Sequence, residues 1–74
     1  MIIEISHPAA GDDLVAFLQA ARCEAEQAGP RRITVSLPDA PSEQAAQRRL
    51  ELYLAEWQAR HPGMRARRKP RYDL

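Results

Sequence analysis

The sequence predicts a small α/β protein: a two-layer βαβαβ sandwich in which both helices cover one face of a three-stranded, mostly parallel sheet. Three observations lead to this fold class. Short segments with strand-like alternation are separated by longer segments whose apolar residues recur at helical spacing. Strands that alternate with helices are typical of crossover units with parallel strands. Each predicted strand has one polar face, so both helices are expected on the other face.

The first predicted element is a strand over residues 1–6, with the sequence MIIEIS. Its β-branched residues favour extended structure, and His7 followed by Pro8 ends the segment. Because alternate residues of a strand point to opposite faces, Ile3 and Ile5 are expected to face the core together.

Residues 13–28 are predicted to form the first helix. Asp12 or Asp13 can cap its start. At the other end, Gly29 stands where helices commonly place a terminal glycine, and Pro30 cannot continue a helix. The apolar stripe of this helix is expected to consist of Leu14, Phe17, Leu18, Ala21, Ala25 and Ala28.

A second strand is predicted over residues 32–37, where apolar and polar side chains alternate cleanly. The second helix is predicted over residues 42–61, with Ser42 as a possible cap and a His-Pro-Gly sequence at its end. Leu52 lies off the apolar stripe of this helix, so it is expected to be exposed and to indicate a contact surface.

The last predicted strand covers residues 64–69 and is followed by a short tail, residues 70–74. Apolar residues occupy even positions here and basic residues occupy odd positions, which is the strand period. Arg68 breaks this alternation, and Pro70 cannot donate a hydrogen bond to a neighbouring strand. The whole chain, residues 1–74, is expected to be a single domain.

Charge is distributed unevenly along the chain. Residues 1–63 hold six basic and nine acidic groups, a net charge of −3, whereas residues 64–74 hold five basic groups and one acidic group, a net charge of +4. No segment is long and apolar enough to span a bilayer, and the N-terminus lacks the features of a signal peptide. The single cysteine, Cys23, leaves no partner for a disulfide within the chain, so a cytoplasmic, bacterial protein is expected.

Two candidate sites follow from the predicted sheet. The polar sheet face would form a basic surface that could bind the phosphates of a nucleic acid or another anionic partner. This surface has no aromatic residue on which a base could stack. The residues of this basic surface are Arg32, Arg65, Arg67, Arg68, Lys69 and Arg71. The carboxyl ends of parallel strands would bring together His7, Asp12 and Asp39 as a possible enzyme site.

The function expected from these features is that of a small non-enzymatic binding module, which associates with itself or with a protein partner. Nucleic-acid binding through the basic surface is the alternative, and an enzyme at the strand ends is a more distant one. No metal site or cofactor is expected, because the sequence contains no glycine-rich phosphate-binding motif and no cluster of cysteines. The apolar first strand, residues 1–6, is a candidate edge for pairing between two copies.

Overall fold

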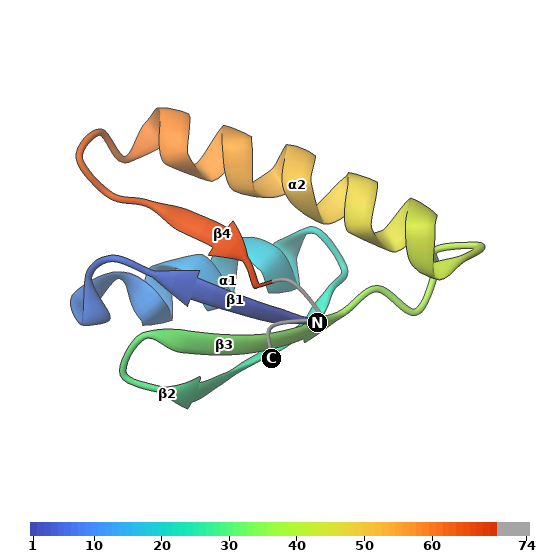
Figure 1. Ribbon diagram of the computed structural model, residues 1–74, viewed down its shortest axis with the longest axis horizontal. Helices are drawn as coiled ribbons and strands as arrows, with labels where there is room; N and C mark the ends of the chain where they lie inside the picture. Colours follow the sequence, from blue (N-terminus) through green and yellow to red (C-terminus); the bar gives the residue numbers. More distant parts are fainter. Residues whose placement is uncertain (70–74) are drawn as a thin grey trace.

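The computed structural model describes residues 1–69, which form a sheet and the helices that pack against it (Figure 1). The predicted tail, residues 70–74, lies outside the described residues. In chain order the elements are β1 (Ile2–Ile5), the 3-10 helix η1 (Pro8–Ala10), α1 (Gly11–Ala20), β2 (Glu24–Gly29), β3 (Arg32–Ser36), α2 (Glu43–Arg60) and β4 (Ala66–Arg68).

Within residues 1–69 the sheet has four strands in the order β2-β3-β1-β4, and every neighbouring pair is antiparallel. The prediction of a three-stranded, mostly parallel sheet is therefore wrong. In the register of the sheet, Ile3 of β1 lies opposite Ile33 of β3 on one side and Arg68 of β4 on the other. The order of elements and strands is a split β-α-β arrangement, a topology that by itself implies no function.

The error arises in the predicted helix 13–28, which divides into α1 and β2. Over residues 23–26, burial follows the strand period: Cys23 and Ala25 are buried, and Glu24 and Glu26 are exposed. Ala28, which the helical stripe would have buried, is exposed. A strand at this point gives the sheet a fourth strand. This strand, β2, pairs with the next strand, β3, in antiparallel orientation.

Helix α1 ends in a hydrogen-bonded C-terminal motif that turns the chain into β2. The backbone N–H of Arg22 donates to the carbonyl of Gln19 at 3.0 Å, and the N–H of Cys23 donates to the carbonyl of Leu18 at 3.0 Å. This is the Schellman pattern, in which the residue after the helix takes a left-handed conformation and is usually glycine. Here that residue is Arg22, with φ of 68°.

Replacing Arg22 with glycine is expected to raise the free energy of unfolding by about 0.5–1 kcal/mol, because glycine adopts a positive φ without steric cost. Urea denaturation measures this change as a higher midpoint at an unchanged slope. Arg22→Ala is the matched control, since alanine keeps the steric cost. An equal gain from both replacements would show that the backbone conformation is not the cause.

The Gly29-Pro30 pair, predicted to end a helix, instead begins the turn of the β2–β3 hairpin. Pro30 and Arg31 form the connection, and Gly29 lies opposite Arg32. Proline suits a tight turn because its ring holds φ near the value that the first central position requires. A register shift between Gln27 and Gly29 adds an extra residue to β2 and forms a bulge.

One hydrophobic core lies between the sheet and the two helices. The inner face of the sheet contributes Ile3, Ile5, Ala25, Ile33, Val35 and Ala66, the connection before β2 contributes Cys23, and the helices contribute Leu14, Leu18, Leu50, Leu54 and Trp57. The expectation that both helices cover the same face is met, because residues of α1 and α2 belong to this single cluster. The other face of the sheet is left open, and Ile2 is 39% exposed on it.

Helix α2 begins at a side-chain cap. The Ser42 hydroxyl accepts the backbone N–H of Ala45 at 3.1 Å, which satisfies one of the free donors at the helix start. At the far end of α2, Trp57 is fully buried and His61 occupies the C-cap position. The helix therefore presents one apolar side to the sheet along its whole length and leaves the opposite side in solvent.

Candidate functional site

The residues predicted at the strand ends do not form one site. Because β1 and β3 are antiparallel, the carboxyl end of β1, which precedes His7, lies opposite the start of β3, whereas Asp39 follows the far end of β3. Asp12 accepts a hydrogen bond from the Gln27 amide at 2.6 Å, and His7 Nδ1 lies 2.7 Å from the hydroxyl of Ser6. Within residues 1–69, no three acidic, histidine or cysteine side chains group as a metal site would require.

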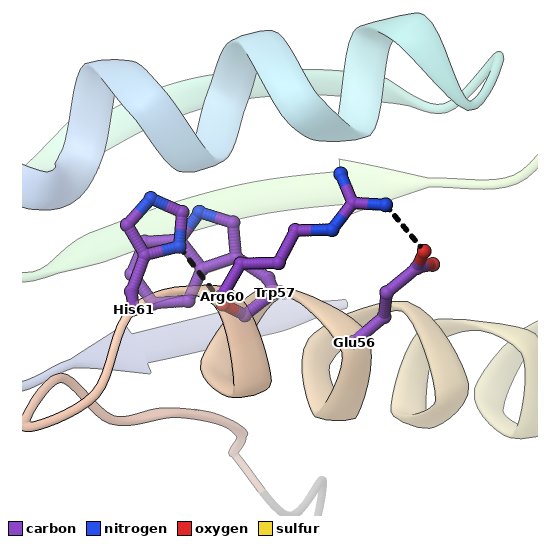
Figure 2. Close-up of polar contacts among 4 residues, drawn as sticks. All are labelled: Glu56, Trp57, Arg60 and His61. Carbon is purple, nitrogen blue, oxygen red and sulfur yellow. Dashed lines mark hydrogen bonds and ion pairs between the residues drawn. The ribbon is translucent and has the colours of Figure 1, made fainter.

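Asp13 is the point at which several polar groups meet. Its Oδ2 atom accepts the indole N–H of Trp57 at 2.8 Å and lies 2.9 Å from Nε2 of His61. The other ring nitrogen of His61, Nδ1, lies 2.8 Å from the carbonyl oxygen of Trp57, and the two rings stack with centroids 4.4 Å apart (Figure 2). A protonated imidazole ring would donate to both of these acceptors.

This arrangement joins the first turn of α1 to the last turn of α2. The carboxylate of Asp13 lies at a helix N-terminus and the ring of His61 at a helix C-terminus, where each charge is favoured. Both nitrogens of His61 are occupied by groups of the protein itself, so neither is directed at a ligand. Asp13, Trp57 and His61 therefore act together as a structural clamp. Sequence patterns do not reveal it, because 44 residues separate Asp13 from Trp57.

The open face of the sheet is not uniformly basic. Glu4 lies in the middle of the sheet, opposite Arg32 on β3 and Arg67 on β4. The guanidinium of Arg67 is 3.8 Å from the carboxylate of Glu4, and the Arg67 side chain is 81% exposed. Strand β2 then adds Glu24 and Glu26 to the same open face, since both are exposed and lie opposite Ser36 and Thr34, the exposed residues of β3. The hydroxyl of Ser36 donates to the Glu24 carboxylate at 3.0 Å.

The other residues predicted for the basic surface are divided between different environments. Arg68 points toward α2, where its guanidinium lies 3.3 Å from the Glu51 carboxylate, in agreement with its break in the alternation. Arg65 is exposed and its backbone N–H donates to the hydroxyl of Ser6. Lys69 is half-buried, and its backbone N–H donates to the carbonyl of Ile2 at 2.7 Å. Arg71 lies outside the described residues.

Cys23 is buried beneath α1 and is not positioned as a nucleophile. Its side chain belongs to the hydrophobic core, and it is only 6% exposed. Burial raises the pKa of the Cys23 thiol, because the thiolate loses its hydration in an apolar surrounding. The neutral thiol therefore persists to higher pH than an exposed cysteine would allow, which lowers its reactivity.

At each of the two edges of the sheet, a glutamine side chain from the adjacent helix binds one backbone group. The Gln19 amide of α1 donates to the backbone carbonyl of Ala25 on β2 at 3.0 Å. The amide oxygen of Gln58 of α2 accepts the backbone N–H of Ala66 on β4 at 3.2 Å. Such side chains occupy backbone groups that another strand would need for pairing. Strand β1, the predicted dimer edge, lies inside the sheet between β3 and β4, so that prediction is wrong.

The solvent-facing side of α2 carries the most exposed large apolar residue of the described chain. Leu52 is 70% exposed, as its position off the apolar stripe predicts. Around it lies a narrow stripe of small and charged residues, which we name the α2 outer face. It consists of Ala45, Arg48, Leu52, Glu56 and Ala59. At 3.6 residues per turn, these five positions fall within an arc of about 80°.

Comparison with protein-family models, with curated proteins and with solved structures finds no match. No helix in residues 1–69 is both long enough and apolar enough to cross a membrane. The assignment of a function therefore depends on the surfaces described above.

Proposed function

We propose that this protein is a small, non-enzymatic interaction module of the cytoplasm that associates with copies of itself through the α2 outer face. The observation that carries the proposal is the 70% exposure of Leu52 at the middle of an 18-residue helix. A large apolar side chain in this position gains free energy when a partner covers it. A domain of this size also buries a smaller share of its surface on folding than a larger domain does, so association adds to its stability.

The α2 outer face suits association better than the sheet edges do. Both edges have a backbone group occupied by the amide of Gln19 or Gln58. The helix, in contrast, has all of its backbone hydrogen-bonding groups satisfied internally except at its ends, so that a partner would meet only side chains. The small residues of this face, Ala45 and Ala59, are short and would allow close approach.

Nucleic-acid binding through the open sheet face is supported less well. Glu4 lies between Arg32 and Arg67, and the carboxylates of Glu24 and Glu26 line the β2 side of the face. A polyanion laid across this face would meet carboxylates as well as arginines. If an oligonucleotide were nevertheless bound with an affinity that falls steeply with salt, this alternative would gain support.

Replacing Leu52 with glutamine is expected to weaken self-association by at least about tenfold, because an apolar contact at the centre of an interface is lost without a change of net charge. Sedimentation equilibrium of the full chain from about 10 μM to about 1 mM measures this effect as a change in the dimer dissociation constant. The matched control is Ile2→Thr on the open sheet face, since Ile2 is the other large exposed apolar residue within residues 1–69.

The control variant should dimerise as the wild-type chain does. A wild-type chain that stays monomeric over the whole concentration range would contradict the proposed self-association. Dimerisation that is lost in Ile2→Thr and kept in Leu52→Gln would place the interface on the sheet face instead.

A further inference from the structure

The residues of the α2 outer face are arranged symmetrically about Leu52. Arg48 precedes it by four positions and Glu56 follows it by four. Ala45 precedes it by seven positions and Ala59 follows it by seven. The face therefore has a large apolar residue at its centre, opposite charges one turn away on either side, and a small residue two turns away on either side.

Such a pattern is complementary to itself when two copies meet in opposite directions. In an antiparallel pair of helices related by a two-fold axis at Leu52, a residue four positions before the centre lies beside the residue four positions after the centre of the other copy. Each Arg48 is then placed beside a Glu56 of the second copy. A two-fold interface requires this reciprocity, in which the same two positions pair twice.

The remaining positions of the face are consistent with close packing. Ala45 of one copy would lie beside Ala59 of the other, and two short side chains allow the helix axes to approach to about 8–10 Å. A parallel arrangement in the same register would instead place Arg48 beside Arg48 and Glu56 beside Glu56. That arrangement brings like charges together, so the charge pattern selects the antiparallel direction.

The charged groups of this face are available for such pairing. Within residues 1–69, the Arg48 side chain makes no hydrogen bond or ion pair. Glu56 is paired with Arg60 of its own helix at 2.8 Å, and both side chains are more than half exposed (Figure 2). Arg60 lies to one side of the face, 5.8 Å above the ring of Phe17 on α1, so it leaves the other side of Glu56 open to a second cation.

We infer that a second copy of this chain docks on the α2 outer face in antiparallel orientation, with Leu52 at the two-fold axis and Arg48 paired with Glu56 of the other copy. The inference rests on the proposed self-association and adds its geometry. A single pair of helices buries less than the roughly 1,200 Å² typical of stable complexes, so a weak and reversible dimer is expected, with a dissociation constant on the order of 10⁻⁵ to 10⁻⁴ M.

Charge exchange tests this geometry directly. Arg48→Glu alone and Glu56→Arg alone each place like charges together in a dimer of identical chains, and each is expected to weaken dimerisation by about tenfold or more. An equimolar mixture of the two variants forms mixed dimers in which both contacts join opposite charges. The mixture is therefore expected to dimerise within about threefold of the wild type, as measured by sedimentation equilibrium at low salt.

Three controls keep the outcomes distinct. The double variant Arg48→Glu with Glu56→Arg again places opposite charges beside each other in a dimer of identical chains, so it should dimerise alone. Glu26→Arg on the open sheet face changes net charge as Glu56→Arg does and should leave dimerisation unchanged. Circular dichroism of each single variant checks that the helix is intact, since Glu56→Arg also removes the pairing with Arg60.

The result that overturns the inference is a wild-type dimer that the single variants do not weaken, or a mixture that stays as weak as its components. Either outcome would leave self-association in place and move it to another surface or direction. A wild-type chain that never dimerises would instead remove the proposed function itself. The two failures are thus distinguishable in the same set of measurements.

Discussion

Replacing Asp13 with alanine is expected to lower the free energy of unfolding by about 2–3 kcal/mol. The Trp57 side chain is fully buried, and without Asp13 its indole N–H would lose its hydrogen-bond acceptor. An unsatisfied buried donor costs about 1–3 kcal/mol. The lost charge at the start of α1 adds about 0.3–1 kcal/mol, and the contact with His61 is lost as well.

Thermal unfolding followed by circular dichroism measures this loss, and a fall in melting temperature of about 4–8 °C is expected for each kcal/mol. Asp12→Ala is the matched control, because Asp12 carries the same charge in the same turn but bonds the exposed amide of Gln27. Its expected cost is about 0.5–1 kcal/mol. Equal losses for the two variants would mean that Asp13 acts only through the helix dipole and that the clamp contributes nothing.

Asp13→Asn separates charge from hydrogen bonding at the same position. The amide oxygen can still accept the indole N–H, whereas the attraction to the His61 ring is reduced. We therefore expect this variant to fall between the wild type and Asp13→Ala in stability. A loss as large as that of the alanine variant would place most of the stabilisation in the charge.

Replacing Ala25 with aspartate is expected to lower the free energy of unfolding by about 3 kcal/mol or more, because a carboxylate would be forced into the core. Ala25 is 8% exposed on the inner face of β2, opposite Val35. The same replacement at Ala28, which is exposed at the bulge of β2, is expected to change the free energy by less than about 0.5 kcal/mol.

Urea denaturation of both variants distinguishes the strand from the helix that the sequence predicts. In a helix over residues 13–28, Ala25 and Ala28 would share the apolar stripe and their replacements would cost similar amounts. If Ala25→Asp proves too unstable to fold, the milder pair Ala25→Ser and Ala28→Ser should show the same difference on a smaller scale. Similar losses within either pair would contradict the antiparallel hairpin.

The segment around Ala25 shows why the fold class could not be predicted correctly. Alanine and glutamate, which dominate CEAEQA, favour helices, and the small apolar residues fit a helical stripe as well as a strand face. What makes this segment a strand is its pairing with β3, together with the left-handed turn at Arg22 that follows α1. Tertiary pairing therefore overrides local propensity here, as it commonly does for strands.

The surfaces, too, could be predicted from the sequence only where they depend on a single element. Exposure of Leu52 follows from helical periodicity within a single element, and sequence alone was sufficient for it. The clamp of Asp13, Trp57 and His61 joins two helices, and the pairing of Glu4 with Arg67 joins two strands, so neither follows from local spacing. The predicted basic surface was incomplete for this reason, because it lacked the carboxylates that β2 contributes.

By itself the sequence determined the local elements that have a clear period: the strands near residues 1–6, 32–37 and 64–69 and the helix over residues 42–61. Periodicity and capping act over a few residues, so they can be recognised without a partner. Only the tertiary structure decided that the chain has a fourth strand, that all strand pairs are antiparallel, and that β1 is internal. These features depend on contacts between distant segments, and their free energy is gained only when both segments are in place.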